Sequence, residues 1–380
     1  METKKYRFDE VTINFDKKRI PLSSAQREKR QGTFRYYGAQ GVIDHVDDYI
    51  FDGTYLLIAE DGENLKSKKQ NIAQVVDGQF WVNNHAHIVQ GNERCDTRFL
   101  CYLINSMDLS GYVTGSAQPK LSQANLNAIT LSLPTLVEQK RIVEYLYMLD
   151  QKIDVNRQIN DNLEQQAQSY FQELFVDNAS PEWTTGTISD LGTVVGGSTP
   201  SKAKPEYYTE SGIAWITPKD LSINKSKFVS HGENDITELG LRNSSASLMP
   251  EGTVLFSSRA PIGYIAIAAG EVTTNQGFKS VVPKPEIGTP FVYFFLKNTL
   301  PVIEGMASGS TFKEVSGSTM KNVSAVIPDA ETLAKFSDFC APIFAQQRIL
   351  EEQNQSLATL RDNLLPKLMS GEIDVSAVQL

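Results

Sequence analysis

Several short segments of the sequence combine Arg and Lys with Asn, Gln, Ser and aromatic residues. They are residues 27–41 (REKRQGTFRYYGAQG), 60–69 (EDGENLKSKK), 81–87 (WVNNHAH), 196–208 (GGSTPSKAKPEYY), 215–221 (WITPKDL), 257–263 (SSRAPIG) and 273–280 (TTNQGFKS). Arg can pair with guanine and Asn or Gln with adenine, while Lys, Ser and backbone amides can hold phosphate. We interpret these segments as loops suited to reading DNA edges and gripping its backbone.

The candidate DNA-binding residues are cationic, amide, hydroxyl, aromatic and imidazole side chains of these segments, together with a lysine from each of two later turns. They are Arg27, Lys29, Arg30, Arg35, Tyr36, Tyr37, Gln40, Lys66, Lys68, Lys69, Asn83, Asn84, His85, Lys120, Ser198, Thr199, Ser201, Lys202, Lys204, Lys219, Ser257, Ser258, Arg259, Asn275, Gln276, Lys279 and Lys313. For any one of these residues, an ordinary role on the solvated surface is about as good an explanation as a contact with a DNA base.

Motifs for nucleotide binding and base methylation are missing from the sequence. Residues 194–202 (VVGGSTPSK) contain glycines but no GxxxxGK[ST], and neither GxGxxG nor the Asn-Pro-Pro-aromatic motif of amino-methyltransferases occurs. We therefore expect no catalytic residue and no cofactor site in this chain.

Two other groups could in principle do chemistry. His85 and His87 would share one face of a strand, as two metal ligands do, but no third Cys or acidic ligand is nearby, which favours a structural or surface role. Asp61, Glu63 and Lys66 could form a nuclease site, although any chain this rich in charge offers such triples.

A twenty-residue segment of the chain occurs twice. Residues 115–134 (GSAQPKLSQANLNAITLSLP) align without a gap with residues 309–328 (GSTFKEVSGSTMKNVSAVIP) at a constant offset of 194. Apolar positions obey the same offset, as Leu121 and Val315 do. An internal duplication is the direct explanation.

A long helix is expected after each copy of this segment. Thr135 and Glu138 have the spacing of a capping box. Apolar residues then recur every 3.5 positions, the signature of a coiled coil. The predicted seam is Ile142, Leu146, Leu149, Ile153, Asn156, Asn160, Leu163, Ala167, Tyr170 and Leu174, and adding 194 gives Phe336, Cys340, Ile343, Gln347, Leu350, Asn354, Leu357, Arg361, Leu364 and Leu368.

Polar residues interrupt this seam. Asn160 and Asn354 occupy equivalent positions, where a buried Asn can fix register, or can simply tolerate a wet seam. Pro342 removes a backbone donor, so a kink or a fresh helix start is expected there. Two such helices in one chain would pair most simply antiparallel.

The larger segments have mixed α and β character. Residues 53–62 and 85–91 read as strands and 97–107 as a helix. Their counterparts are 252–263, 278–283 and 290–300. The predicted fold class is α+β, with two globular mixed α/β domains separated by two long helices that pair as an antiparallel coiled coil, and with an internal pseudo-twofold repeat. The expected boundaries are 1–134, 135–180, 181–328 and 329–380.

The net charge of −9 does not exclude a nucleic-acid partner, because the acidity is local. Residues 135–180 and 329–380 each carry 4 basic and 8 acidic side chains, whereas residues 1–134 carry 16 of each and 181–328 carry 12 and 13. No apolar run approaches the ~20 residues of a membrane span and the first thirty residues lack a signal-peptide core, so we expect a cytoplasmic protein without membrane contact.

Motifs along nearly the whole chain resemble those of specificity (S, or HsdS) subunits of type I restriction-modification systems. They lie at residues 36–62, 82–89, 133–146, 196–202, 215–222, 256–267, 274–280 and 368–376. Together these motifs are highly specific, and that family is prokaryotic.

The resemblance implies a noncatalytic subunit whose two target recognition domains, residues 1–134 and 181–328, each read one half of a bipartite double-stranded DNA target. The conserved helical regions 135–180 and 329–380 would set the half-site spacing and dock two methyltransferase subunits, and restriction subunits with motor and nuclease activity would join them. S-adenosylmethionine, ATP and Mg²⁺ would belong to those partners.

Two other classes of function stay open from the residues alone. One is a stand-alone, two-armed nuclease or DNA-modifying enzyme, which would need metal-dependent activity from the isolated chain. The other is a coiled-coil adaptor that binds only proteins, which would show no sequence-dependent DNA protection.

Overall fold

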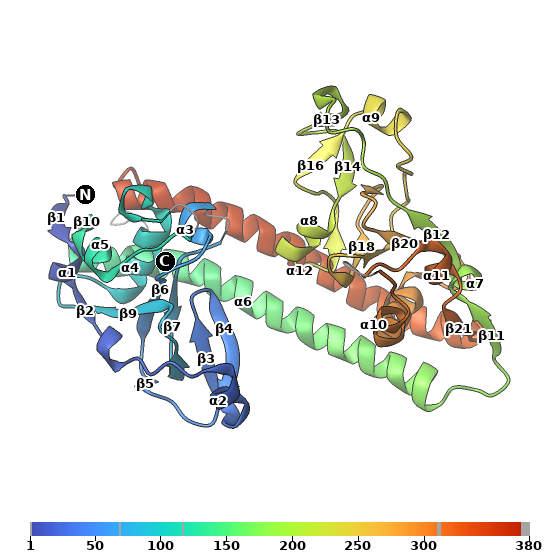
Figure 1. The fold of residues 1–380 in the computed structure, drawn as a ribbon, viewed down its shortest axis with the longest axis horizontal. Coiled ribbons are helices and arrows are strands. Elements are labelled where there is room, and N and C mark those ends of the chain that lie inside the picture. The colour runs from blue at the N-terminus through green and yellow to red at the C-terminus, as the bar shows by residue number, and fades with distance from the viewer. Residues whose placement is uncertain (1, 68–69, 116–117, 310–312, 374–380) are drawn as a thin grey trace. The chain divides into compact units, whose positions relative to one another are not determined.

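A computed structural model describes residues 2–67, 70–115, 118–309 and 313–373. The chain forms two compact units: residues 1–152 with 356–380 make the first unit, and residues 153–355 make the second. Each unit combines one of the mixed α/β segments with a stretch of both long helices (Figure 1).

The described part of the first unit contains three antiparallel or mixed sheets. One has the order β2 (Thr12–Asn14), β9 (Ala86–Gly91), β6 (Tyr55–Ala59), β7 (Ala73–Val76), and another the order β4 (Gly41–Val46), β3 (Gln31–Gly38), β8 (Gln79–Val82), β5 (Phe51–Asp52). The third pairs β1 (Lys4–Arg7) with β10 (Thr130–Leu133). The helices are α1 (Phe8–Val11), α2 (Ser24–Glu28), α3 (Asn64–Ser67), α4 (Thr97–Ser106) and α5 (Gln123–Ala128), with 3-10 turns at Asp16–Lys18 and Ser110–Tyr112.

The second unit, over its described residues, repeats this plan with a larger sheet. Its main sheet has the order β12 (Gly192–Gly196), β20 (Lys279–Pro283), β17 (Val254–Ser258), β18 (Ile262–Ala268), β15 (Phe228–Val229). A further sheet runs β13 (Tyr208–Thr209), β16 (Asn234–Ile236), β14 (Ile213–Ile216), β19 (Thr273–Thr274), and β11 (Thr184–Thr187) pairs with β21 (Ser324–Ile327). The helices are α7 (Ile188–Leu191), α8 (Pro218–Ile223), α9 (Glu238–Arg242), α10 (Thr289–Gly305) and α11 (Gly317–Lys321), with a 3-10 turn at Pro205–Tyr207.

Both units begin with strand, short helix, strand, and end with α5 or α11 followed by a closing strand (Figure 1). Ser122 and Ser316 cap α5 and α11, each accepting a hydrogen bond from the backbone amide three residues on. The predicted duplication is therefore confirmed in the fold. The expected strand 85–91 and helix 97–107 are confirmed within a residue or so. Residues 252–263, in contrast, contain β17 and only the start of β18, and helix α10 is longer than predicted.

The long helices are α6 (Leu136–Gln172), which ends in a π-helical turn at Glu173–Asp177, and α12 (Ala330–Ser370). Thr135 and Glu138 form the expected capping box, because the Thr135 amide and hydroxyl both donate to the Glu138 carboxylate (2.9 and 2.8 Å). Each of the twenty predicted seam positions is buried or half-buried, which confirms the heptad reading. Helix α12 continues through Pro342, so no fresh helix start occurs there, and a kink at Pro342 stays a prediction.

The helices pair antiparallel in both units. In the first unit Arg361 donates to Asp150 (2.6 Å), and in the second the Asn156 side chain donates to that of Asn354 (2.9 Å). Residues later in α6 therefore pair with residues earlier in α12, as in an antiparallel arrangement. Apolar side chains of the helices complete the core of each unit: Ile142 and Leu368 join Phe99 in the first, while Phe171 and Phe336 join Phe291 in the second.

Within the described ranges, no helix combines the length and apolar character needed to cross a bilayer.

Candidate nucleic-acid interface

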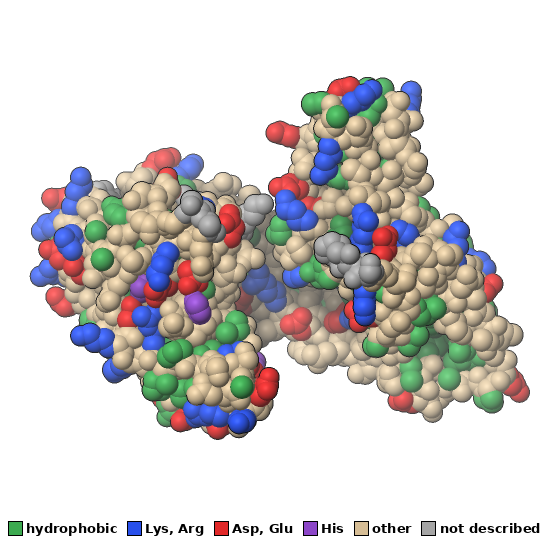
Figure 2. Space-filling model, in the orientation of Figure 1, with side chains coloured by type: hydrophobic (Ala, Val, Ile, Leu, Met, Phe, Trp, Pro, Cys, Tyr) green, Lys and Arg blue, Asp and Glu red, His purple; other side chains and the backbone are tan. Residues whose placement is uncertain are grey.

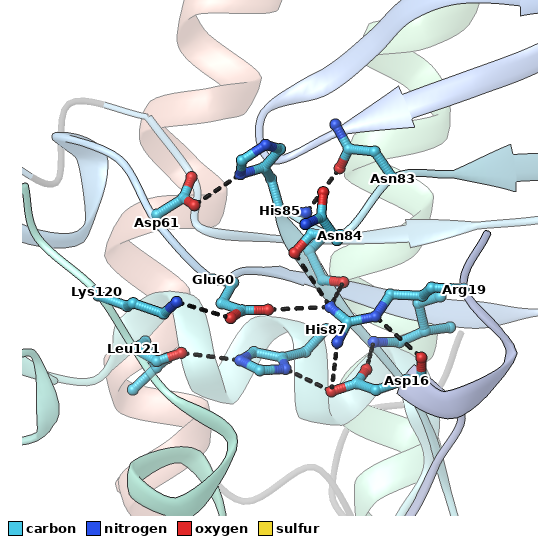
Figure 3. A network of polar contacts seen from close by, with 12 residues as sticks. Asp16, Arg19, Glu60, Asp61, Asn83, Asn84, His85, His87, Lys120 and Leu121 are labelled. Atoms are coloured by element: carbon cyan, nitrogen blue, oxygen red, sulfur yellow. Dashed lines mark hydrogen bonds and ion pairs between the residues drawn. The ribbon is translucent and has the colours of Figure 1, made fainter. Parts of the chain in front are cut away.

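In the first unit, the connection between β8 and β9 is a turn made by an asparagine side chain (Figure 3). The Asn83 side-chain oxygen accepts a hydrogen bond from the His85 amide (2.8 Å), and the Asn83 amide donates to the carbonyl of Tyr37 (2.9 Å). An Asn side chain that bonds to the backbone two residues on stabilises such a turn. Asn84 is exposed at its tip, and its carboxamide makes no hydrogen bond to the described residues.

Charged side chains support this turn from below (Figure 3). The Arg19 guanidinium donates to the carbonyls of Asn84 (3.3 Å) and Ala86 (2.9 Å), and it pairs with the Glu60 carboxylate (3.0 Å). The other oxygen of Glu60 lies 3.3 Å from the Lys120 ammonium. Glu60 thus lies between two cations. Burial would raise the pKa of its carboxyl, but hydrogen bonds from Arg19 and Lys120 and the positive charges of His87 and Arg19 lower it.

His87 lies beside this network and is buried. Its Nδ1 is 2.7 Å from Asp16 and its Nε2 is 2.8 Å from the Leu121 carbonyl. Both partners are acceptors, so the ring donates to both only as an imidazolium. Although burial alone would lower the pKa of His87, these hydrogen bonds raise it. Burial opposes ionisation of Asp16 as well, but His87 and the Ile88 amide lower its pKa below the usual value.

The two histidines of this region have separate environments. His85 is exposed and its Nδ1 lies 2.7 Å from Asp61, whereas His87 is enclosed. In the described part of the chain, no three His, Cys, Asp or Glu side chains are grouped so that they could hold a metal ion. Of the residues considered for a nuclease site, Asp61 pairs with His85 and Lys66 donates to the Gly115 carbonyl (2.8 Å).

The second unit builds the same turn between β19 and β20. The Asn275 side-chain oxygen accepts from the Gly277 amide (2.8 Å), and the Asn275 amide donates to Ile216 (3.0 Å). Gln276 is exposed at the tip, and its side-chain carbonyl accepts from the Thr199 hydroxyl. The two units therefore display a carboxamide side chain at equivalent positions.

Charged groups again lie under the turn of the second unit. The Lys279 ammonium is 3.5 Å from the Gln276 carbonyl and 3.6 Å from the Glu314 carboxylate. The other oxygen of Glu314 is 3.5 Å from the Arg259 guanidinium.

A glycine-rich loop packs directly against this turn. The Ser198 amide donates to the Thr274 carbonyl (2.8 Å), and the Trp215 indole donates to the Ser198 carbonyl (3.0 Å). A Cβ at Gly197 would lie 1.9 Å from the Asn275 carbonyl, so only glycine permits this approach. The approach brings Thr199 within reach of Gln276.

Comparison with known proteins identifies the family. The model of the type I restriction modification DNA specificity domain matches residues 2–165 and again residues 181–360. The chain belongs to the type I restriction-modification DNA specificity family. The two matches coincide with the two halves of the internal repeat, and the missing catalytic motifs agree with the noncatalytic role of this specificity family.

Curated members of the specificity family resemble this chain over part or most of its length. The MjaIX specificity subunit of Methanocaldococcus jannaschii is 38% identical over 191 residues, and this match covers 48% of the present chain and 44% of that protein. The HindI specificity subunit of Haemophilus influenzae is 24% identical over 85% of this chain and 84% of its own length. This chain thus spans less than half of MjaIX but most of HindI.

A solved member of the specificity family has the same fold. The crystal structure of the S subunit from M. genitalium aligns with a TM-score of 0.58 over 97% of this chain and 96% of that one, at 15% sequence identity. The likeness supports two mixed α/β segments and paired long helices as the architecture of the family.

The candidate residues that come together lie at the two turns. Gln40, Asn83, Asn84, His85 and Lys120 gather in the first unit, and Ser198, Thr199, Arg259, Asn275, Gln276 and Lys279 in the second. Figure 2 shows that acidic and basic side chains are intermixed on the visible faces and form no continuous basic surface.

Other basic candidates of the first unit lie away from its turn and are paired. Arg27 contacts Asp44 (2.8 Å), Arg30 contacts Asp47 (2.9 Å), and Arg35 donates to the Asp77 carbonyl (2.8 Å). Their guanidinium groups also lie over aromatic rings, those of Tyr36, Trp81 and Tyr37 respectively. Lys29 is exposed nearby.

The remaining lysines of the second unit are spread over its surface. Lys202 and Lys204 are exposed with Ser201, and the Lys204 ammonium lies 5.2 Å from the centre of the Tyr207 ring. Lys219 pairs with Glu233. Lys313 is exposed, but the position equivalent to Lys120 at the offset of 194 holds Glu314.

Four candidate side chains are buried and therefore support strands in this structure. They are Tyr36, Tyr37, Ser257 and Ser258. The Tyr36 hydroxyl accepts from the Leu22 amide (2.8 Å), and the Ser257 hydroxyl donates to the Pro261 carbonyl (2.9 Å). Lys68 and Lys69 lie outside the described residues.

The sequence interpretation missed the charged residues that hold the turns: Arg19, Glu60 and Glu314. Arg19 stands 65 residues from Asn84 along the chain and 41 from Glu60, so no local pattern connects them. The repeat offers one signal for Glu314, because the offset of 194 matches it to Lys120, a charged position in both copies.

Proposed function

We propose that this chain reads a bipartite double-stranded DNA target, with residues 1–134 and 181–328 acting as the two target recognition domains. The carrying observation is that both units display an exposed carboxamide on the same asparagine-stabilised turn while the surrounding side chains differ. Equivalent scaffolds with different side chains suit a protein that must bind two different half-sites.

The helical regions, residues 135–180 and 329–380, set the distance between the half-sites in this proposal. Two-site DNA readers fix half-site spacing through the geometry of the elements that join their reading heads. The net acidic charge of both regions suits contact with protein better than with phosphate.

The same helices would dock two copies of a methyltransferase subunit. Val155 on α6 and Ile349 on α12 are related by the offset of 194, and their side chains are 47% and 48% exposed. An apolar side chain left exposed at both members of a repeat-related pair fits two identical partners related by a twofold. Motor-nuclease subunits would complete the assembly in the prokaryotic cytoplasm, with S-adenosylmethionine, ATP and Mg²⁺ bound by the partners.

Co-expression of the full chain with its cognate methyltransferase subunits tests this function. The purified complex should contain two methyltransferase subunits per chain and should methylate one split sequence with a fixed spacer. A complex that methylates DNA without sequence preference, or subunits that do not assemble, would contradict the proposal.

A further inference from the structure

The turns at Asn83 and Asn275 occupy the same place in their units. Val82, before the first turn, pairs in parallel with Tyr37, and Thr274, before the second, pairs in parallel with Ile216. Each turn asparagine accepts from the amide two residues on at the same distance of 2.8 Å. The exposed tip residues, Asn84 and Gln276, are therefore structural equivalents.

In both units a cationic side chain contacts the backbone carbonyl of the tip residue. This cation pairs with a carboxylate, and the carboxylate pairs with a second cation; we call this series of contacts a relay. In the first unit this relay runs from Asn84 through Arg19 and Glu60 to Lys120 (3.3, 3.0 and 3.3 Å).

In the second unit the relay runs from Gln276 through Lys279 and Glu314 to Arg259 (3.5, 3.6 and 3.5 Å). The order of charges is the same as in the first unit.

Equivalent positions of the repeat do not carry the same charge in the two relays, since Lys120 of the first corresponds to Glu314 of the second. The backbone bridge between Asp61 and Lys120 has its counterpart in the bridge between Arg259 and Glu314. The acidic and basic side chains of the bridge therefore trade places between the two units. The carboxylate comes from the end of β6 in the first unit and from the loop before α11 in the second. The shared feature is thus the arrangement of charges and not the residues that supply it.

We propose that Asn84 and Gln276 are specificity-determining residues, each pairing through its carboxamide with an adenine in one half-site, and that Glu60 and Glu314 position them. This inference rests on the proposed DNA-reading function. A carboxamide presents an amino group that can donate to N7 of adenine, beside a carbonyl oxygen that can accept from the N6 amino group in the major groove.

The geometry suits this task in three respects. The tips are exposed, their backbone is fixed by the turn hydrogen bonds, and the Thr199 hydroxyl orients the Gln276 carboxamide. The flanking cations Lys120 and Arg259 stand where phosphate or a further base could be met. A carboxylate between two cations holds their side chains in place, which lowers the ordering cost on binding.

The first test uses Asn84→Ala and Gln276→Ala in the reconstituted complex, with methylation measured on targets carrying every single-base substitution. Asn84→Ala should erase the preference for adenine at one position of one half-site by about 5- to 150-fold, the discrimination of one bidentate pair. Gln276→Ala should do the same in the other half-site only, so each variant serves as the control for the other.

The second test separates positioning from simple charge repulsion. By charge alone, removing a carboxylate should strengthen DNA binding to all sequences alike. This is expected for Glu286→Gln, which removes an exposed carboxylate beyond the end of β20 that lies away from the turn. Glu314→Gln should instead lower the ratio of specific to nonspecific affinity, measured by competition binding at fixed salt. An unchanged or higher ratio would overturn the positioning role.

The outcomes distinguish the inference from the function on which it rests. A wild-type complex without sequence preference would refute the proposed function. A sequence-specific wild-type complex whose preferences survive both alanine variants would refute the assignment of Asn84 and Gln276 while leaving the function in place. Thermal unfolding of each variant verifies that the fold is retained.

Discussion

His87 and Asp16 form a buried pair whose charges depend on each other. The pKa of His87 is raised, so the imidazolium contributes stability that is fully present below its unfolded pKa of about 6.5 and is lost as pH rises through the folded pKa. The pKa of Asp16 is lowered, so its contribution is present above about 3.9 and is lost as pH falls through its folded pKa.

Replacing His87 by Gln should therefore flatten the pH dependence of stability between pH 6 and pH 8.5. The wild-type chain should lose stability over this interval relative to His87→Gln, because only the wild type loses a buried positive charge beside Asp16. Urea unfolding of both proteins at the two pH values measures the difference. The same change in both proteins would show that folding does not raise the pKa of His87.

A cluster of charged side chains in the second unit predicts that the substitution of Glu164 will lower the free energy of unfolding strongly. The Lys227 ammonium is 2.5 Å from Glu164 on α6 and 2.7 Å from Gln347 on α12, and burial lowers its pKa. Glu164→Gln leaves this ammonium without its carboxylate, which should cost about 3–5 kcal/mol of unfolding free energy. Urea unfolding measures this cost, and a loss below about 1 kcal/mol would contradict a buried Lys227 ammonium that depends on the Glu164 carboxylate.

At the scale of elements, the helix pair is where sequence and structure agree most closely. The heptad pattern and the capping box at Thr135 are local signals, so the helix start and the seam follow from neighbouring residues. The positions of Arg19 and Lys227 do not, because their partners lie far along the chain and a single Arg or Lys reads as a surface residue. The sequence interpretation also missed the β17–β18 hairpin, because residues 252–263 were matched to the single strand expected at residues 53–62.

The polar seam predicts a nonadditive response to mutation. Asn156 donates to Asn354, while the Asn156 side-chain oxygen has no partner among the described residues. Asn156→Leu leaves the half-buried Asn354 amide facing an apolar side chain, and Asn354→Leu leaves the buried Asn156 amide with only its long bond to Gln353 (3.4 Å). Each single change should cost about 1–3 kcal/mol. The double change should recover most of the loss, because two facing leucines restore an apolar seam.

A double-mutant cycle from urea unfolding measures this coupling. Additive losses would mean that the two asparagines do not interact across the helix pair. Leu350→Ala, an apolar truncation on the same seam, provides a control that should destabilise through lost packing alone.

At the scale of the whole molecule, the repeat predicts two equivalent docking positions. Val155→Asp and Ile349→Asp each place a charge on one exposed apolar position and should leave the fold intact. Each single variant should assemble with one methyltransferase subunit instead of two, and the double variant with none, as measured by native mass spectrometry. Two bound subunits in the double variant would place docking elsewhere.

The central claim is that each half of the chain reads its own half of one DNA target. Methylome sequencing of cells that express the complex, before and after residues 1–134 are exchanged for those of another member of the specificity family, tests it most directly. The account predicts one bipartite motif in which the exchange alters a single half-site and leaves the other half-site and the spacer length unchanged. An exchange that altered both half-sites would contradict it.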